Sequence, residues 1–135
     1  MVFVDSNVFI AIWDKDNAFH DRAVAKSKQL EKTGESIVIS NIIIYEVATV
    51  LAMRVAKSKS REFLSSIEHN PMQTIFVDGR IDSEAKEIFQ KITDKDVSFF
   101  DCTSFAIIEQ FGFKKVFSFD KDFLKYGQRR GWEFV

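Results

Sequence analysis

The chain begins with Met1-Val2-Phe3-Val4-Asp5-Ser6-Asn7, in which a short apolar run ends abruptly in polar residues. Val and Phe favour β-strands, and a run that is apolar at every position is typical of a strand buried on both faces. Asp and Ser favour turns and helix N-termini, because their side chains accept hydrogen bonds from free backbone N–H groups. The stretch therefore predicts a buried strand that is followed directly by a helix.

Apolar runs alternate with helix-like periodicity along the rest of the chain. Further strands are predicted at 36–39, 74–77, 115–118 and 132–135, and helices at 7–13, 18–32, 41–56, 61–68, 82–92, 101–111 and 120–126. Ser40 is expected to cap the third helix, Ser58 or Ser60 the fourth, and Asn70-Pro71 to stop the fourth. Residues 94–100 are expected to form a loop. This alternation predicts an α/β fold, in which helices cover both faces of a mainly parallel sheet as a three-layer α/β/α sandwich.

Length and composition indicate one globular unit. The 135 residues are 46% hydrophobic and include 15 Phe, which is sufficient apolar surface for a single core. Only one proline occurs and no low-complexity segment marks a linker. We therefore expect one domain that spans residues 1–135.

Charge and cysteine content restrict the environment. Nineteen basic and twenty acidic residues give a net charge of −1, so no global field attracts the chain to nucleic acid or to a membrane. The single Cys102 cannot form an internal disulfide, and no segment approaches the ~20 apolar residues of a membrane span. We expect a soluble cytoplasmic protein.

Four acidic residues lie at the ends of apolar strands or within an apolar helix. Asp5 follows the first strand, Asp101 follows Val97-Ser98-Phe99-Phe100, and Asp120 follows Val116-Phe117-Ser118-Phe119. Glu46 interrupts the apolar run Ile42–Ala48. Ligands bind beyond the carboxyl ends of strands in open α/β sheets, so convergence of these acids at one edge is expected.

Each of these acids also has an ordinary structural explanation. Asp5, Asp101 and Asp120 can cap a helix or interact with its dipole. Glu46 can form a salt bridge, for instance with Arg54, because a carboxylate in apolar surroundings needs a partner. These alternatives stay open for the sequence alone.

Convergence of the four carboxylates would require a cation or protonation. Two carboxylates about 5 Å apart repel each other by roughly 3 kcal/mol at an effective dielectric of 20. Oxygen-only ligands favour Mg²⁺ or Mn²⁺ over Zn²⁺, and neither His20 nor His69 has the spacing of a metal ligand. Such a metal site can activate water for attack on a phosphodiester, without a side-chain nucleophile.

The ordered set of acidic motifs resembles the PIN domain, the metal-dependent ribonuclease fold of VapC-type toxins. The motifs that carry the resemblance are Val2-Phe3-Val4-Asp5-Ser6-Asn7, Ser40-Asn41-Ile42-Ile43-Ile44-Tyr45-Glu46-Val47, Val97-Ser98-Phe99-Phe100-Asp101-Cys102 and Phe117-Ser118-Phe119-Asp120-Lys121-Asp122-Phe123. The resemblance covers nearly all of the chain and implies a central parallel sheet, an acidic pocket that binds Mg²⁺ or Mn²⁺, and RNA as substrate.

The resemblance also implies roles for individual residues. Asp5, Glu46, Asp101 and Asp120 take the catalytic and metal-ligand positions, with Asp122 as a supplementary metal ligand or a solvated acid. Asn7 and Ser118 are expected to orient the carboxylates, and Ser118 stands where the family often has Thr. Many such toxins pair with a small antitoxin whose Arg or Lys side chains fill the acidic groove.

Two basic clusters are candidates for RNA binding. The first contains Arg54, Lys57, Lys59 and Arg61, and the second contains Lys121, Lys125, Arg129 and Arg130. Such side chains contact phosphates without reading sequence, although a solvated charged face explains them equally well. The helix at 42–55 is apolar on nearly every side, which suggests a homodimer interface or burial in the monomer.

Three rival functions remain for the sequence alone. A phosphoaspartate enzyme or receiver also carries Asp after its first strand, but Asp5-Ser6-Asn7 has no second Asp two residues on, and Lys114-Lys115 precedes its strand. A non-catalytic PIN-like module for RNA binding or scaffolding would have no physical need to keep four mutually repelling acids. A housekeeping RNA-processing nuclease would carry the same acids as a toxin.

Overall fold

The computed structural model describes residues 1–70 and 72–135. In these ranges the elements follow the order β1 (Val2–Val4), α1 (Ser6–Trp13), α2 (His20–Lys32), β2 (Ile37–Ser40), α3 (Asn41–Arg54), α4 (Lys57–His69), β3 (Gln73–Ile75), α5 (Gly79–Lys91), α6 (Phe99–Phe111), β4 (Lys115–Phe117), α7 (Lys121–Gln128) and β5 (Glu133–Phe134). The strands form one sheet in the order β3-β2-β1-β4-β5, and every pairing is parallel.

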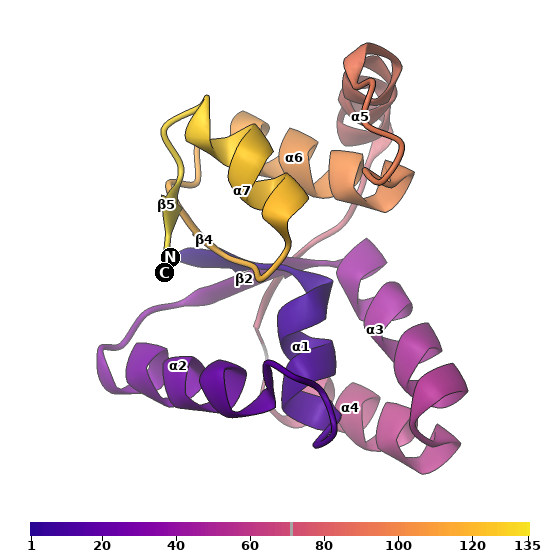
Figure 1. Ribbon diagram of the computed structural model, residues 1–135, viewed down its shortest axis with the longest axis vertical. Helices are drawn as coiled ribbons and strands as arrows, with labels where there is room; N and C mark the ends of the chain where they lie inside the picture. Colours follow the sequence, from indigo (N-terminus) through magenta and orange to yellow (C-terminus); the bar gives the residue numbers. More distant parts are fainter. Residues whose placement is uncertain (71) are drawn as a thin grey trace.

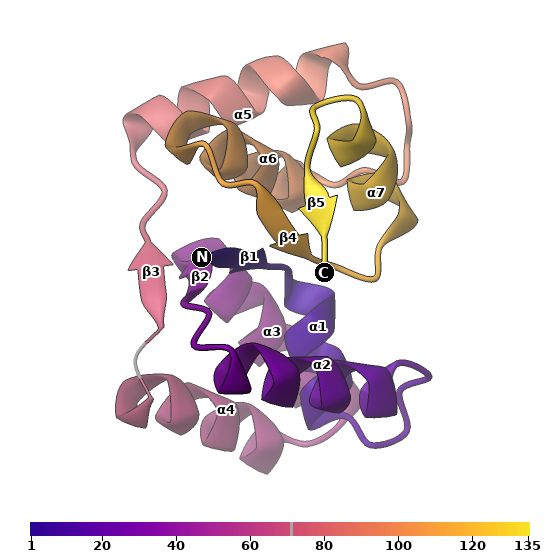
Figure 2. The same ribbon diagram turned by 90° about the vertical axis from the view of Figure 1, so that its left-hand side faces the viewer.

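The helices form two layers, one on each face of this sheet. Figure 1 shows α1, α2, α3 and α4 on one side of the strands and α5, α6 and α7 on the other, and Figure 2 shows the strands side by side between them. This arrangement confirms the predicted α/β fold with a three-layer sandwich and a parallel sheet. Each layer covers one sheet face, because a strand that is apolar on both faces must be shielded twice.

The strand order places a crevice next to β1. The chain steps from β1 through β2 to β3 on one side of the sheet, and then returns to the other side of β1 for β4 and β5. Such a reversal is a topological switch point, where ligands bind beyond the carboxyl ends of the adjacent strands. The switch point in this protein lies beyond the ends of β1 and β4.

The central strand is buried along its whole length. Val2, Phe3 and Val4 are at most 3% exposed, as expected for a strand with neighbours on both edges and helices on both faces. Val2 is level with Ile37 of β2 and with Lys115 of β4. The backbone N–H of Asp5 continues this ladder by donating to the carbonyl of Phe117 at 3.0 Å, so Asp5 is fixed to the end of β4.

Aromatic side chains fill much of the core on both faces of the sheet. Phe63 packs beneath α1, where its ring lies 5.9 Å from that of Phe9. Phe105 on α6 stacks on Tyr126 of α7 with ring centroids 4.0 Å apart. Trp132 also packs on Tyr126 and closes over Gly127, where a Cβ atom would lie 2.4 Å from the indole ring. These contacts hold α6 and α7 firmly beside the switch point.

Of the helix caps predicted from the sequence, that of α3 was right and those of α4 were wrong. Ser40 caps α3 as expected, because its hydroxyl accepts from the N–H of Ile43 at 3.1 Å. The predicted caps of α4 were wrong, since that helix begins at Lys57 after Ala56. Ser60 is buried instead, and its hydroxyl donates to the carbonyl of Ala48 at 2.6 Å. The polar first turn of α4 carries no apolar residue that would reveal it in the sequence.

The starts of α5 and α6 were also placed too late. The carboxylate of Asp78 accepts from the N–H of Ile81 and begins α5 at Gly79. Ser98 begins α6 at Phe99, inside the stretch that was expected to be a loop. The fourth helix ends at His69 with Asn70 as its C-cap, so the predicted stop at Asn70 is confirmed, whereas Pro71 lies outside the described residues. No helix in the described ranges is sufficiently long and apolar to cross a membrane.

Candidate active site

Asp5 is the most deeply buried of the predicted site residues. It is 4% exposed and caps α1, with one carboxylate oxygen accepting from the N–H of Ser6 at 2.7 Å. The other oxygen accepts from the hydroxyl of Ser118 at 2.8 Å. The first oxygen also lies 3.4 Å from the Ser6 hydroxyl, which donates to it. These hydrogen bonds fix the carboxylate and leave further lone pairs free to bind a cation.

Asn7 and Ser118 join the start of α1 to the loop after β4. The amide nitrogen of Asn7 donates to the Ser118 hydroxyl at 3.2 Å, and its amide oxygen accepts from the N–H of Phe119 at 3.2 Å. The same hydroxyl accepts from the N–H of Asp120 at 3.0 Å. The Ser118 hydroxyl therefore accepts two hydrogen bonds and donates one to Asp5, so its orientation is fixed.

Glu46 faces the site from the second turn of α3. Helix α3 starts at the carboxyl end of β2, and Figure 1 shows its start beside the start of α1. The side chain is partly buried, and no ion pair to Glu46 is found within the described ranges. Arg54 lies eight residues further along, about 12 Å along the helix axis, so the structure does not contain the salt bridge considered from the sequence.

Asp101 is fixed by a capping box. The hydroxyl of Ser98 accepts from the N–H of Asp101 at 3.1 Å, and the Asp101 carboxylate accepts from the N–H of Ser98 at 2.9 Å. Asp101 is thus the third residue of α6, not its N-cap. The second carboxylate oxygen is not used by the box.

Asp120 and Asp122 lie together at the start of α7. Asp120 is the N-cap, and its carboxylate accepts from the N–H of Asp122 at 2.8 Å. Both side chains are partly exposed. The structural explanations considered from the sequence therefore hold for Asp5 and Asp120 as caps, and they coexist with a shared site.

Electrostatic coupling shows which of these acids face one another. Burial raises the pKa of Asp5 from 3.8 to about 7; the hydrogen bond from Ser118 opposes this shift, and the charges of Asp101 and Glu46 add to it. Burial also raises the pKa of Glu46, opposed by the Ser6 side chain and increased by Asp101. The three carboxylates thus share one region of low dielectric and repel one another.

Asp101 connects this group to the start of α7. Burial raises the pKa of Asp101, the hydrogen bond from the backbone of Ser98 lowers it, and the charges of Asp120 and Asp122 raise it further. Partial burial and the charges of Asp120, Asp94 and Asp96 raise the pKa of Asp122. The acids therefore form a continuous negative region around Asp101.

The donor chemistry of this region fits a hard divalent cation. Every candidate ligand is a carboxylate oxygen, and the ion pairs found in residues 1–70 and 72–135 do not include Asp5, Glu46, Asp101 or Asp120. The side chains do not, however, form a ready cage, since no three acidic, His or Cys residues in the described ranges are close enough to hold a metal ion. The acidic region thus fits a divalent cation in its charge and in the type of its ligand atoms.

The predicted RNA-binding residues lie at different distances from the acids. Lys121 directly follows Asp120 and is exposed. Arg54, Lys57 and Arg61 are exposed at the junction of α3 and α4, which Figure 1 shows far from α7. Lys59 forms a surface ion pair with Glu62 at 3.1 Å.

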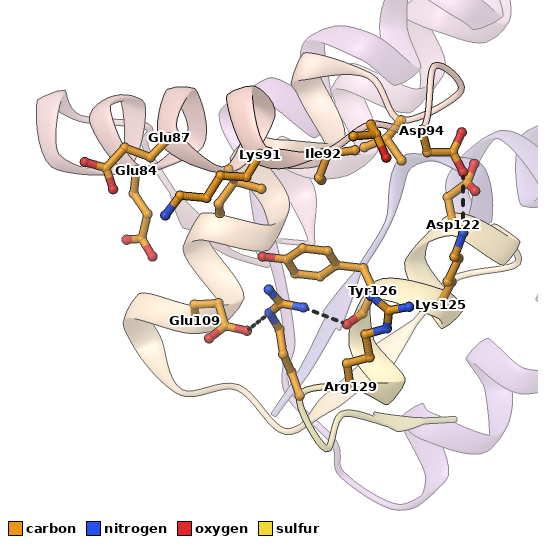
Figure 3. Close-up of a pocket in the computed structure, with 14 residues that line it drawn as sticks. Glu84, Glu87, Lys91, Ile92, Asp94, Glu109, Asp122, Lys125, Tyr126 and Arg129 are labelled. Carbon is orange, nitrogen blue, oxygen red and sulfur yellow. Dashed lines mark hydrogen bonds and ion pairs between the residues drawn. The ribbon is translucent and has the colours of Figure 1, made fainter.

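Three residues of the second basic cluster, Lys125, Arg129 and Arg130, line a pocket of about 460 Å³ between α5, α6 and α7 (Figure 3). Arg130 pairs with Glu109 at 3.3 Å, and its guanidinium carbon lies 3.5 Å from the ring centroid of Tyr126. Lys125 approaches Asp94 at 4.0 Å. Asp122 is the predicted site residue that lines this pocket, so the pocket adjoins the acidic region but does not contain it.

Two residues at the site were not assigned roles from the sequence. Ser6 binds Asp5 through its backbone and opposes the rise in pKa of Glu46, while Ser98 positions Asp101. The spacing of Ser98 and Asp101 resembles a capping box, which offers a usable signal. Ser6 offers no such signal, because its importance depends on where α3 packs.

Comparison with known proteins identifies the family. The family model of the PIN domain matches residues 2–128, so the chain belongs to the PIN domain family. The 23S rRNA-specific endonuclease VapC20 of Mycobacterium tuberculosis is 26% identical over 128 residues, which cover 94% of this chain and 95% of that protein. This relative confirms the predicted resemblance to VapC-type toxins.

Solved structures share the fold along nearly the whole chain. The crystal structure of M. tuberculosis VapC20, described as a toxin that cleaves the sarcin-ricin loop, superposes with a TM-score of 0.82 at 24% identity, covering 94% of this chain and 95% of that chain. VapBC2 from Rickettsia felis, bound to a DNA fragment from its promoter, gives 0.70 at 13% identity, with coverage of 100% and 98%. FitAcB from Neisseria gonorrhoeae gives 0.65 at 19% identity, with coverage of 89% and 88%.

Proposed function

We propose that this protein is a Mg²⁺- or Mn²⁺-dependent endoribonuclease, and that residues 1–135 act as one nuclease unit. The observation that carries the proposal is the buried Asp5 carboxylate, which faces Asp101 and Glu46 at the switch point without a cationic side chain from the described residues. Such a charge is costly unless protonation or a metal ion relieves it. A divalent ion supplies positive charge for a phosphodiester and lowers the pKa of water for hydrolysis.

Each acidic residue contributes differently to such a site. Asp5 is rigid because Ser6 and Ser118 hold its two oxygens. The capping box fixes Asp101 with one oxygen left over. Asp120 is held at the start of α7, and Asp122 adds negative charge beside it.

The support for the proposed ligand set is strongest at its centre. Asp5, Glu46 and Asp101 are mutually coupled, and Asp120 and Asp122 are coupled to Asp101. Asn7 and Ser118 keep Asp5 in place, as residues behind metal ligands commonly do. We assign Asp122 the role of a supplementary metal ligand, because its side chain also lines the neighbouring pocket.

RNA is the proposed substrate. The VapC20 relative is named as an endonuclease specific for 23S rRNA, which supports RNA for this chain without fixing the sequence that is cut. Lys121 is the basic residue nearest to the acids in the chain and is assigned to phosphate binding. Arg54, Lys57, Lys59 and Arg61 are assigned to a more distant part of a large RNA.

A small antitoxin is the proposed protein partner, which makes this protein the toxin of a type II pair. The VapBC2 and FitAcB structures share the fold, and the support for an antitoxin is the resemblance to VapC-type toxins, many of which pair with one. The negative region around Asp101 would attract Arg or Lys side chains of such a partner. A housekeeping RNA-processing role is the alternative, and a neighbouring gene for a short protein would favour the toxin.

A homodimer is proposed from the outer face of α3. Tyr45, Thr49 and Met53 follow at four-residue spacing and are exposed, with Met53 81% and Tyr45 58% accessible. Residues four apart lie on one face of a helix, so these side chains form one exposed stripe, in which Thr49 separates the large Tyr45 and Met53 side chains. Sedimentation of wild type and Met53→Glu would test this assembly, and a wild-type monomer at micromolar concentration would contradict it.

The nuclease is tested by cleavage of a panel of structured RNAs with Mg²⁺, with Mn²⁺ and with a chelator. Asp5→Asn is run beside Glu68→Gln, an exposed acid on α4 that is matched for loss of one charge. We expect metal-dependent cleavage by wild type and Glu68→Gln and no cleavage by Asp5→Asn. Tight RNA binding without metal and without cleavage would favour the non-catalytic scaffold instead.

A further inference from the structure

Two stacked phenylalanines, an exposed one and a partly buried one, lie beside the acidic residues. Phe19 precedes α2, and Phe119 stands between Ser118 and Asp120 in the loop that leads to α7. Their ring centroids are 4.6 Å apart and their planes are inclined by 9°. Residues one hundred positions apart in the chain thus form one aromatic surface next to two residues of the candidate site.

The position of Phe119 follows from the local backbone. Its N–H donates to Asn7, while the side chains of its neighbours Ser118 and Asp120 bind Asp5 and the start of α7. Its own ring meets that of Phe117 edge-on, with the ring centroids 5.4 Å apart, and stacks on Phe19. The network that orders the carboxylates therefore also orders this ring.

One face of the pair remains open. Phe119 is partly buried, with Phe117 and Phe19 as neighbours, whereas Phe19 is 39% exposed although Phe119 covers one of its faces. An aromatic face that is open to water binds another planar group by stacking, and every nucleic-acid base offers one. The second face of Phe19 is thus available to a base.

An arginine completes this surface. The guanidinium carbon of Arg22 lies 5.6 Å from the centroid of Phe19 and 5.4 Å from that of Phe119. A group in contact with an outer face would be much farther from the second ring, so Arg22 lies at the side of the pair and covers neither outer face. Arg22 is exposed and takes part in none of the ion pairs found in the described part of the chain.

We propose that Phe19, Phe119 and Arg22 form a stacking platform that holds one unpaired base of the RNA, with Arg22 on the adjacent phosphate, next to the scissile position. This inference rests on the proposed function. RNA fits better than a protein segment because a guanidinium beside an open aromatic face matches a nucleotide in both charge and shape. The platform supplies positive charge where the neighbouring carboxylates would otherwise repel the RNA backbone.

Binding is measured in an Asp5→Asn background with Mg²⁺, so that the RNA stays intact and binding is separated from cleavage. The probe is a short single-stranded RNA with one 2-aminopurine, whose fluorescence falls when the base stacks. In this background Phe19→Leu keeps an apolar side chain but removes the ring, and Phe19→Trp keeps a ring. Phe111→Leu is the matched control, because Phe111 is 54% exposed, stacks on Phe113 and lies at the far end of α6.

We expect Phe19→Leu to weaken binding roughly 5- to 100-fold and to abolish the quenching, with Phe19→Trp and Phe111→Leu close to the parent. Arg22→Ala should lower the slope of log K against log salt by about 0.7, whereas Lys28→Ala, on another face of α2, should not. Unchanged RNA binding in Phe19→Leu would overturn the proposal and leave the pair as a contact that fixes the turn before α2, or as a protein-binding surface. Equal losses in Phe19→Leu and Phe111→Leu would overturn it as well.

The outcome is separable from that of the nuclease. Platform-dependent binding without metal-dependent cleavage by wild type would keep the platform and reject the nuclease. Metal-dependent cleavage by wild type with unchanged RNA binding in Phe19→Leu would keep the nuclease and reject the platform. Thermal unfolding of Phe19→Leu and Phe19→Trp shows whether a loss of RNA binding reflects a loss of folding. If both variants are folded, a difference in their RNA binding reports the aromatic ring alone.

Discussion

Acidic residues lie beside both ends of β1 in contrasting surroundings. At the amino end, Glu35 lies between the ammonium group of Met1, at 2.9 Å, and the Lys115 side chain. At the carboxyl end, Asp5 has hydrogen bonds from Ser6 and Ser118 but no cationic partner among the described residues. The same short strand thus separates a compensated carboxylate from an uncompensated one.

The pKa values express this difference. Hydrogen bonds from Lys115 and from the chain N-terminus lower the pKa of Glu35 to about 2, whereas burial raises the pKa of Asp5 to about 7. A fold that needed only stability would have no reason to leave Asp5 without a cation. The contrast supports the proposed metal site, because ion pairs neutralise the acid at the amino end whereas the acid at the carboxyl end has no cationic side chain among the described residues.

The largest effect is expected from removing one charge at each end. Asp101→Asn should lower the initial rate of RNA cleavage in Mg²⁺ by at least about 10²-fold, because it removes the carboxylate that couples to all the other acids. The asparagine oxygen can still accept from Ser98, so the capping box should stay. Glu35→Gln should leave the rate unchanged. Equal rates for the two variants would contradict the division between the ends.

Removing the hydroxyl behind Asp5 should have the next largest effect. Ser118→Ala takes away the donor to Asp5 and the acceptor for Asn7 and Asp120, and should lower activity or metal affinity by about 10- to 100-fold. Ser118→Thr keeps the hydroxyl and should stay near wild type. Metal titrations of the cleavage rate measure both variants. Matching losses in Ala and Thr would show that packing at this position, not the hydroxyl, supports the site.

The sequence revealed the carboxyl end better than the amino end. Asp5, Asp101 and Asp120 stand directly after apolar runs, and Glu46 stands inside one, so local pattern was sufficient to select them as candidates, and their role at the site stays a prediction. Ser40 was found for the same reason, since a capping residue lies next to the helix that it starts. The strand order was expected only as a parallel sheet, because which strand lies at the centre depends on long-range packing.

Other features were missed because they depend on contacts between distant segments. Phe19 meets Phe119 across 100 residues of chain. Asn7 and Ser118 were each expected to orient the carboxylates, but the hydrogen bond between them joins residues 111 apart and was not predicted. No local pattern marks which exposed Phe among fifteen will be stacked, or which basic residue will be neutralised, as Arg130 is by Glu109. Tertiary packing decides these points, and only a structure gives them.

Charge at Asp5 should also reduce the stability of the metal-free protein. The folded state keeps the proton up to about pH 7 and the unfolded state loses it near 3.8, so stability is greatest below 3.8 and falls as pH rises through 7. A shift of three pKa units corresponds to a free energy on the order of 4 kcal/mol. Asp5→Asn also loses the charged acceptor of the hydrogen bond from Ser118, which costs about 1 kcal/mol. The free energy of unfolding of Asp5→Asn should therefore exceed that of wild type by about 1–3 kcal/mol at pH 8.

Chemical denaturation of wild type and Asp5→Asn with a chelator measures this gain at pH 8 and at pH 4. The gain should disappear by pH 4, where Asp5 is protonated in the folded wild type. Saturating Mg²⁺ should reduce it at pH 8, because the ion binds only the site that keeps its carboxylate. A less stable Asp5→Asn variant at pH 8 would mean that the carboxylate is compensated by a group not recognised in the structure.

The smallest effect is expected at the amino end, with the opposite sign. Glu35 has a lowered pKa, so its stabilising contribution is present above about 4.5 and is lost as pH falls through about 2. Glu35→Gln should therefore destabilise the fold slightly at pH 7 and have no effect near pH 2, because screening by solvent keeps such exposed pairs weak. Thermal unfolding midpoints at the two pH values measure the change. A stabilising Glu35→Gln at pH 7 would show that the amino end, like the carboxyl end, holds its charge at a cost to the fold, and the contrast along β1 would disappear.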